Sequence, residues 1–368
     1  MMLFDHISAE MTLFFILYGI TGAVPLLAAV YLLLRKGNAF APGITPPLRL
    51  RRWATSFFAA SVLGHVLWYL LYIFANDIPI VGYLVIVIFD YVAMMTTITG
   101  TMFAMLQDRK RPIWPVLVAM IPFSVIEVLQ VLYPDDSFTY MGIAYNLSLF
   151  VILFVYMLFA VRRYDRWLND NYADLENKKV WLSMLVSLAF VLLFALYILV
   201  DTYFVLIYLL HIVELVFFAL LLWRVETLPQ LEAQPQPQQT PAVIFNIDLT
   251  NIEHLLEEHC VARQLYLQQD LSLQQLAQSI GTNRSYLSQY FSRQGITYNI
   301  YINNLRINHF ISLYQEAISS HQSYTIQQLA NNSGFRSYST FSLAFKQRTG
   351  QNVTAWTGKV RGEYPTKI

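Results

Sequence analysis

The sequence predicts an all-α protein in which a seven-helix transmembrane bundle is followed by a cytoplasmic domain with two helix-turn-helix units. Three observations carry this prediction. Seven long apolar stretches fill residues 1–224, basic residues occur in only every second loop between them, and two similar stretches, LQQLAQSIG (273–281) and IQQLANNSG (326–334), lie near the end of the chain. Hydrophobic residues make up 56% of the chain and charged residues 13%, about half the charged share of a soluble protein.

A helix that crosses a bilayer needs about 20 mainly apolar residues. The N-terminus, MMLFDHISAE, has no basic region and no small-residue cleavage site, so we expect the first span to be retained. Only Asp201 separates the last two stretches, and we infer a tight turn there because one helix over both would be too long for a bilayer about 30 Å thick. The expected spans are residues 12–34, 53–75, 78–106, 112–133, 138–161, 180–200 and 202–223.

Basic residues gather on one side of the expected bundle. Thirteen of them follow the first, third and fifth spans, and none lies at the N-terminus or in the other loops. Because such loops stay in the cytoplasm, we expect the N-terminus outside, the C-terminal half inside a bacterial cell, and an odd number of spans in the inner membrane. The residues are Arg35, Lys36, Arg49, Arg51, Arg52, Arg109, Lys110, Arg111, Arg162, Arg163, Arg166, Lys178 and Lys179.

Four ionisable residues, His65, Asp90, His211 and Glu214, fall near the middle of their expected spans, and Glu127 lies nearer an outer end. A charged residue at the centre of a span costs roughly 2.5–3.5 kcal/mol on insertion scales, so such residues usually face the bundle interior and pair. His211 and Glu214 are three positions apart and share a helix face. Two interpretations stay open: a pocket that senses a ligand or protons, and hydrogen bonds that fix helix packing.

No cofactor, metal site or catalytic centre is expected. Cys260 is the only cysteine, which excludes an internal disulfide and a CxxC metal site. The chain has no HExxH motif, GxSxG motif or Gly-rich phosphate loop. We therefore expect a protein that is not an enzyme.

The composition changes near Glu226. The stretch ETLPQLEAQPQPQQTP (226–241) is rich in proline and glutamine and predicts an extended or flexible linker. We place this linker at residues 225–247 and the C-terminal domain at residues 248–361. Between Leu265 and Arg361, eight Lys and Arg residues stand against two acids, a balance that favours a nucleic-acid partner.

Each repeated stretch begins the pattern of short helix, turn and second helix that defines a helix-turn-helix unit. In the first unit (273–294), Gly281 suits the left-handed residue that closes a helix, and Asn283 can cap the next helix. In the second unit (326–348), Thr325 and Ser337 can cap the two helices.

One helix of about 20 residues, expected over residues 298–317, joins the two units and is about 30 Å long. Successive major-groove turns on one DNA face lie about 34–36 Å apart. One domain of this size can therefore place both second helices in adjacent major grooves.

The last hundred residues resemble the DNA-binding domain of the AraC/XylS family. SLQQLAQSIGTNRSYLSQYF resembles the first helix-turn-helix of that family, YINNLRI with Arg306 resembles the start of its linking helix, and GFRSYSTFSLAFKQRTGQ (334–351) resembles its most specific signature. Two positions depart from the family pattern, Val353 where proline is usual and Phe310 where alanine is common. Both departures concern packing rather than a DNA contact.

The outward faces of the second helices supply the expected DNA contacts. Arg can bond guanine, Gln can bond adenine, and Leu can pack on the thymine methyl group. Basic residues at the helix ends are expected to contact phosphates. The expected base-side positions are Arg284, Ser285, Ser288, Gln289, Arg336, Tyr338, Ser339, Ser342 and Leu343, and the expected phosphate-side positions are Arg293, Lys346 and Arg348.

These features together predict a membrane-bound regulator of transcription that binds promoter DNA in response to a signal sensed in the bundle. Expected partners are double-stranded DNA, the lipid bilayer, a second copy of the chain, RNA polymerase, and an unidentified small-molecule or envelope signal. One alternative is a transporter or channel whose C-terminal domain does not bind DNA. Another is an intramembrane enzyme that uses Asp90 or Glu214, although no motif supports it.

Overall fold

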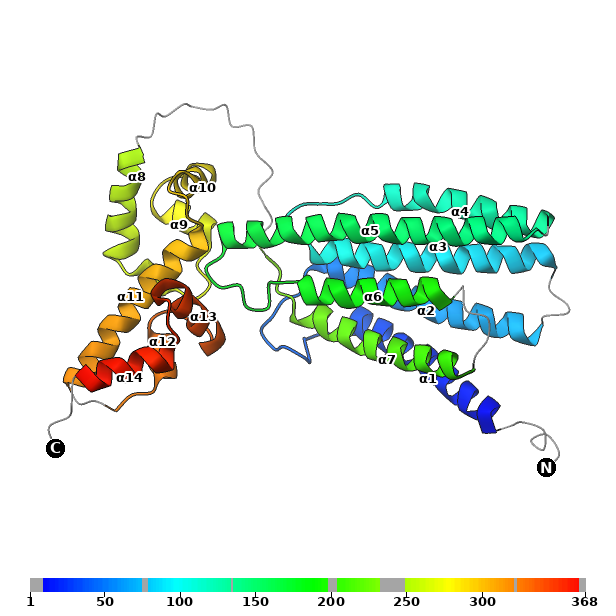
Figure 1. Cartoon of the computed structure of the whole chain (residues 1–368), viewed down its shortest axis with the longest axis horizontal. Helices are drawn as coiled ribbons and strands as arrows, with labels where there is room; N and C mark the ends of the chain where they lie inside the picture. Colours follow the sequence, from blue (N-terminus) through cyan, green and yellow to red (C-terminus); the bar gives the residue numbers. More distant parts are fainter. Residues whose placement is uncertain are drawn as a thin grey trace. The chain divides into compact units, whose positions relative to one another are not determined.

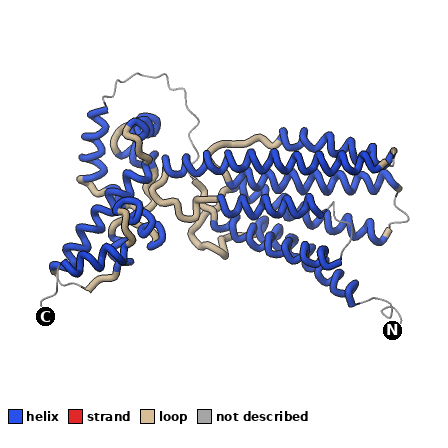
Figure 2. Tube along the Cα trace, in the orientation of Figure 1, coloured by secondary structure: helices blue, strands red, loops and turns tan. Residues whose placement is uncertain are grey.

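The computed structural model describes residues 9–74, 79–133, 135–197, 204–231, 249–320 and 323–363. Within these ranges the protein is built from helices, and extended pairing is limited to one isolated bridge between Tyr172 and Ser272. The all-α prediction is confirmed (Figures 1 and 2). Contacts divide the chain into an N-terminal unit (Met1–Arg162 and Val180–Gln234) and a C-terminal unit (Arg163–Lys179 and Pro235–Ile368).

Long apolar helices form the described part of the N-terminal unit. In this unit α2 packs against α1, α3 and α7, α3 also contacts α4 and α6, and α7 also contacts α1 and α6. The helices are α1 (Ala9–Leu34), α2 (Leu48–Ile73), α3 (Ile80–Met105), α4 (Trp114–Leu132), α5 (Asp136–Asn171), α6 (Trp181–Tyr197) and α7 (Phe204–Thr227), and the last part of α5 belongs to the C-terminal unit.

Six of these helices, α1 to α5 and α7, are long and apolar enough to cross a membrane. Helix α6 is shorter, with 17 described residues. The expected turn at Asp201 lies outside the described residues, as do the expected loop at Asn76 and Asp77 and residues 232–247 of the linker. The six candidate spans therefore support the expected bundle, and the seventh span stays a prediction.

Helices α2 and α3 approach closely because small residues lie where large ones need room. A Cβ atom at Gly100 would overlap the ring of Trp53. Many large apolar side chains face outward instead, among them Leu27, Leu33 and Phe159, which are 68%, 66% and 65% exposed. Such an outer surface suits a lipid environment, in which close packing rather than burial from water holds helices together.

Two helices extend beyond the apolar stretches that predicted them. Helix α5 runs to Asn171, past the expected end of the span at residue 161, because the polar residues that follow contain no proline or glycine. Helix α7 runs to Thr227, and Glu226 is fully buried in an ion pair with Arg35 at 2.9 Å. An apolar stretch thus marks the length of a span and not the end of its helix.

The first residues of the expected linker pack against the N-terminal unit. The side chain of Gln107 donates to the carbonyl of Pro229 at 3.0 Å and accepts from the amide of Leu231 at 2.9 Å. The amide of Gln230 donates to the carbonyl of Thr45 at 2.8 Å. Residues 226–231 belong to the expected flexible linker, but these hydrogen bonds hold their backbone against the N-terminal unit despite its composition.

The C-terminal unit contains the two expected helix-turn-helix units. The three expected caps, Asn283, Thr325 and Ser337, are present, and Ser272 and Thr297 cap two further helices. The side chains of Ser272 and Thr325 each form a capping box with the glutamine three residues later. Gly281 adopts the expected left-handed conformation, with φ +74°. The helices are α8 (Leu249–Leu256), α9 (Leu273–Ser279), α10 (Arg284–Arg293), α11 (Tyr298–Ser319), α12 (Ile326–Asn332), α13 (Tyr338–Thr349) and α14 (Val353–Glu363).

Each helix-turn-helix unit has its own hydrophobic cluster, and α11 contributes to both. Leu276, Leu287 and Phe291 lie in the first cluster. Phe341 and Phe345 lie in the second, together with both residues that depart from the family pattern. Phe310 is fully buried with its ring 4.5 Å from that of Phe341. A large side chain on α11 therefore fills the second core where a smaller one is common in the family.

Arg306 lies on α11 between the two clusters and is 1% exposed. Its guanidinium donates to the carbonyl oxygens of Tyr266 and Gln268 at 2.7 and 2.6 Å, and stacks over the ring of Phe335 at 5.7 Å. Burial lowers the pKa of Arg306 to about 10, so the group still carries its charge at neutral pH. The charge is balanced by backbone dipoles, and these bonds hold the segment before α9 against α11.

We expect Arg306→Ala to lower the free energy of unfolding of the C-terminal unit by about 3 kcal/mol, because two buried carbonyl oxygens lose a charged donor. Arg306→Lys should cost less, since an ammonium can still donate. Cys260 offers a readout: it is fully buried in the first cluster, and burial raises its thiol pKa to about 12, so it reacts only on unfolding. Thiol labelling in increasing urea measures the effect, and the exposed Arg263→Ala is the control.

Candidate functional site

The second helix of each helix-turn-helix unit presents its expected DNA-contacting residues to solvent. On α10, Ser285, Ser288, Gln289 and Arg293 are exposed, while Leu287 and Phe291 on the opposite side are buried. Asn283 accepts from the amide of Tyr286 at 2.9 Å and so fixes the start of the helix. The separation of polar and buried faces leaves the outer face of α10 free for a ligand surface.

Helix α13 repeats this arrangement. Tyr338 and Leu343 are 40% and 56% exposed, and an exposed apolar side chain suits contact with thymine methyl groups. Ser339 is exposed and Ser342 is half-buried. Lys346 and Arg348 are exposed in the last turns of the helix, where phosphate contacts are expected.

Arg336, in the turn before α13, pairs with Asp270 at 3.2 Å. The two side chains are 50% and 67% exposed, and a pair exposed to this degree contributes at most about 1 kcal/mol. The pairing therefore orients Arg336 without preventing its exchange to a phosphate or a base.

Arg284 is in a different situation from its neighbours on α10. Its Nε donates to Oδ1 of Asn171 at 2.7 Å, and Asp170 lies near enough to act on its charge. Burial lowers the pKa of Arg284. The partner residues belong to the segment Arg163–Lys179, at the end of α5 and beyond it. No pattern in the sequence connects this segment with DNA recognition.

Further contacts within the C-terminal unit hold that segment in place. The side chain of Asn299 donates to the carbonyls of Tyr172 and Ala173 at 3.1 and 2.6 Å, and Asn303 donates to Ala173 at 3.2 Å. Ala173 is fully buried and belongs to the first hydrophobic cluster. Two asparagines one turn apart on α11 were the only sequence signal of this contact, and that signal is too common to identify a partner.

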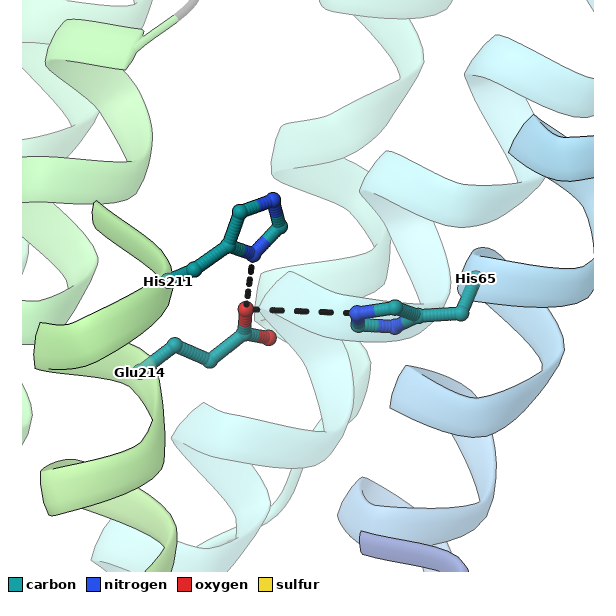
Figure 3. Close-up of side chains that lie close together, drawn as sticks. All are labelled: His65, His211 and Glu214. Atoms are coloured by element: carbon teal, nitrogen blue, oxygen red, sulfur yellow. Dashed lines mark ion pairs between the residues drawn. The ribbon is translucent and has the colours of Figure 1, made fainter. Parts of the chain in front are cut away.

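Within the N-terminal unit, three of the four expected intramembrane residues come together. Glu214 Oε2 lies 3.5 Å from His211 Nδ1 and 4.0 Å from His65 Nε2, as Figure 3 shows. His65 comes from α2, and the other two come from neighbouring turns of α7. The shared helix face expected for His211 and Glu214 is therefore present, and it points toward α2.

Asp90 on α3 lines the same cavity, which has a volume of about 330 Å³. Its carboxylate accepts from Trp68 Nε1 at 2.9 Å. Gly64 makes room for it, since a Cβ atom there would overlap the Asp90 carboxylate. Glu127 does not line this cavity. Thr21 was not among the residues predicted for this site. Its hydroxyl lies 3.1 Å from His65 Nε2 and 3.3 Å from His211 Nδ1.

Comparison with known proteins identifies the class of the C-terminal part. Residues 276–359 match the family described as a helix-turn-helix domain, and this match confirms the resemblance to the AraC type. That part of the chain is thus a DNA-binding regulatory domain, and six apolar helices precede it. No curated protein and no solved structure matches the chain.

We expect base-side and phosphate-side residues to differ in how their loss affects DNA binding. Gln289→Ala should cost about 1–3 kcal/mol on the preferred site and relax the choice of base at one position. Lys346→Ala should weaken binding to all sequences and reduce the slope of log affinity against log salt by about 1. Affinity measured over a salt series tests both, with the exposed Lys359→Ala on α14 as a matched control.

Proposed function

We propose that this protein is a membrane-bound transcription regulator that binds promoter DNA through its AraC-type domain in response to a signal sensed by the helical bundle. The observation that carries the proposal is the presence, on one chain, of two capped helix-turn-helix units with exposed second helices and of six helices able to cross a membrane. A chain with both needs no separate messenger between membrane and DNA.

The charge pattern supports a cytoplasmic position for the DNA-binding domain. The basic residues follow the apolar parts of α1, α3 and α5, some of them within the helices, and Arg224 lies in the last turn of α7. By the positive-inside tendency these positions face the cytoplasm, where bacterial DNA is accessible. An inner-membrane location and contact with RNA polymerase belong to the same proposal. So does a homodimer, because two linked DNA-binding domains gain affinity through effective concentration.

The cavity between α2, α3 and α7 is the best candidate for the signal site. It gathers His65, Asp90, His211 and Glu214, and aromatic side chains from α1 and α2 line much of the rest. Polar groups placed at the depth of a membrane are costly and usually serve a ligand or a proton path. A pocket of this size with a few convergent polar groups has the form of a small-ligand site.

The full-length protein in detergent should select a specific sequence from a random DNA pool. Arg284→Ala combined with Arg336→Ala should weaken binding to that sequence by at least about 30-fold, since each guanidinium bond to a base contributes about 1–3 kcal/mol. A mobility-shift assay with the exposed control Arg263→Ala measures the difference. Absence of any sequence-specific binding would favour a transporter or channel with a regulatory appendage instead.

A further inference from the structure

We propose that His65, His211 and Glu214 form a binding site for a divalent transition-metal ion of the zinc type. This inference rests on the proposed function, because it assigns a chemical class to the signal. The ligand atoms of the three residues all lie within 4.8 Å of one another. Two imidazoles and one carboxylate with a fourth position open is a ligand set that binds zinc and similar ions.

The distances leave room for an ion after small side-chain movements. Metal–ligand bonds of about 2.0–2.2 Å place the ligand atoms of a tetrahedral site about 3.4 Å apart. His211 Nδ1 and Glu214 Oε2 already lie 3.5 Å apart, and His65 Nε2 lies 4.0 Å from the same oxygen. The side chains are 14–18% exposed. The three ligand atoms lie within 4.8 Å of one another, so binding requires side-chain rotations that bring them closer together.

The hydrogen bonds around His65 orient it as a metal ligand. Nδ1 lies 2.8 Å from the carbonyl oxygen of Ser61, which can only accept, so the ring proton is on Nδ1. The other nitrogen, Nε2, then presents a lone pair to Glu214 and Thr21. A backbone carbonyl that holds the far nitrogen of an imidazole is the usual support of a histidine metal ligand.

Thr21 Oγ1, His65 Nε2 and Glu214 Oε2 can all direct lone pairs toward the centre of the cluster. The Thr21 hydroxyl lies 3.0 Å from the carbonyl oxygens of Leu17 and Tyr18, one turn back, and donates its single proton there. Its lone pairs therefore face His65 Nε2 and His211 Nδ1. Lone pairs that face one another are stabilised when a cation lies between them. An ion at the centre would be coordinated by the lone pairs that these atoms direct toward it.

Two further observations favour a cation. Asp90 and Glu214 give the cavity two carboxylates, and among its described lining residues there is no lysine or arginine. The Ser61 hydroxyl is buried, lines the cavity and has no hydrogen-bond partner among the described residues. It is thus available to a water on the ion. Imidazole ligands favour zinc, copper, nickel or iron over magnesium and calcium, which prefer oxygen.

The test uses the full-length protein in detergent and titrates it with Co²⁺, whose visible absorption bands report a low-coordinate site with nitrogen ligands. We expect about one ion per chain, displaced by Zn²⁺ but not by Mg²⁺. His65→Gln and His211→Gln should each weaken binding by more than about 100-fold, since loss of a supporting partner alone costs 10- to 100-fold. His309→Gln and Glu127→Gln, outside the cavity, are matched controls.

Three outcomes would overturn the site: no Co²⁺ binding, binding unchanged in both histidine variants, or an organic cation that occupies the cavity in place of the metal. Because a variant can fail to fold, the stoichiometry and the Zn²⁺ displacement in the unaltered protein are scored separately. DNA binding by the same samples keeps the two proposals apart. Specific DNA binding without a metal site would contradict the metal inference alone, whereas a metal site without specific DNA binding would contradict the proposed function.

A separate observation carries a second inference: we infer that the segment Arg163–Lys179 restrains DNA recognition by occupying Arg284. The N-terminal residues of the second helix in a helix-turn-helix unit are the ones that contact bases. Arg284 is the first residue of α10, and its Nε is bonded to Asn171 at 2.7 Å. Recognition through Arg284 therefore requires this bond to break.

The segment is held by contacts that do not depend on Arg284. Ala173 is buried in the first hydrophobic cluster, and the side chains of Asn299 and Asn303 bond to its carbonyl. The first part of the segment, residues 163–171, is the end of α5, which is one helix from Asp136 to Asn171. The restraint on Arg284 is thus part of the same helix that begins in the N-terminal unit.

Asn171→Ala should tighten binding of the full-length protein to its selected DNA by about fivefold, the effect of about one hydrogen bond. Asn169→Ala is a close control. Both asparagines donate to the carbonyl four residues back, at 2.8 Å for Asn169 and 2.6 Å for Asn171, but only Asn171 has a bond to Arg284. Asp170→Asn should act in the same direction as Asn171→Ala. Unchanged or weaker binding in both Asn171→Ala and Asp170→Asn would overturn the restraint.

Discussion

The buried guanidinium of Arg306 is the interaction on which the C-terminal unit depends. It lies on the one helix shared by both hydrophobic clusters and bonds to carbonyls of the segment that precedes α9. Gly334 packs against the same place, where a Cβ atom would lie 2.8 Å from the backbone of Leu267 and 3.1 Å from Arg306 Nε. The turn of the second unit, the entry to the first and the linking helix therefore meet at one point. A charged, hydrogen-bonded group in that position allows little change in the orientation of the two helix-turn-helix units.

Local chemistry made much of this fold predictable. Asn283, Thr325 and Ser337 cap the helices that the sequence predicted, because a cap depends on residues only a few positions away. Six apolar stretches became long helices for a similar reason, since length and hydropathy are local properties. The end of α7 was not predictable in this way. Tertiary bonds, such as the pair between Arg35 and Glu226, fix residues whose composition suggests a flexible chain.

The candidate sites divide along the same line. Periodicity within α10 and α13 separates the exposed polar face from the buried one, so the outward residues could be named from the sequence. The partner of Arg284 could not, because Asn171 lies 113 positions away. For the intramembrane cluster, the sequence identified costly residues and the i, i+3 pair on α7, but the meeting of α2 with α7 brings His65 to them. Thr21 was missed because a lone threonine in an apolar helix carries no signal by itself.

The proposed metal site and the proposed restraint on Arg284 have a common physical basis. In each, a charged or polar group has a partner that a ligand can replace: a metal for the converging lone pairs near Glu214, and DNA for the Asn171 bond to Arg284. A proline- and glutamine-rich linker transmits little beyond effective concentration. Asn171, by contrast, is the last residue of α5, and its bond to Arg284 lies within the C-terminal unit. Under the proposed restraint, the strength of the bond between Asn171 and Arg284 limits the free energy that its release can contribute to DNA binding.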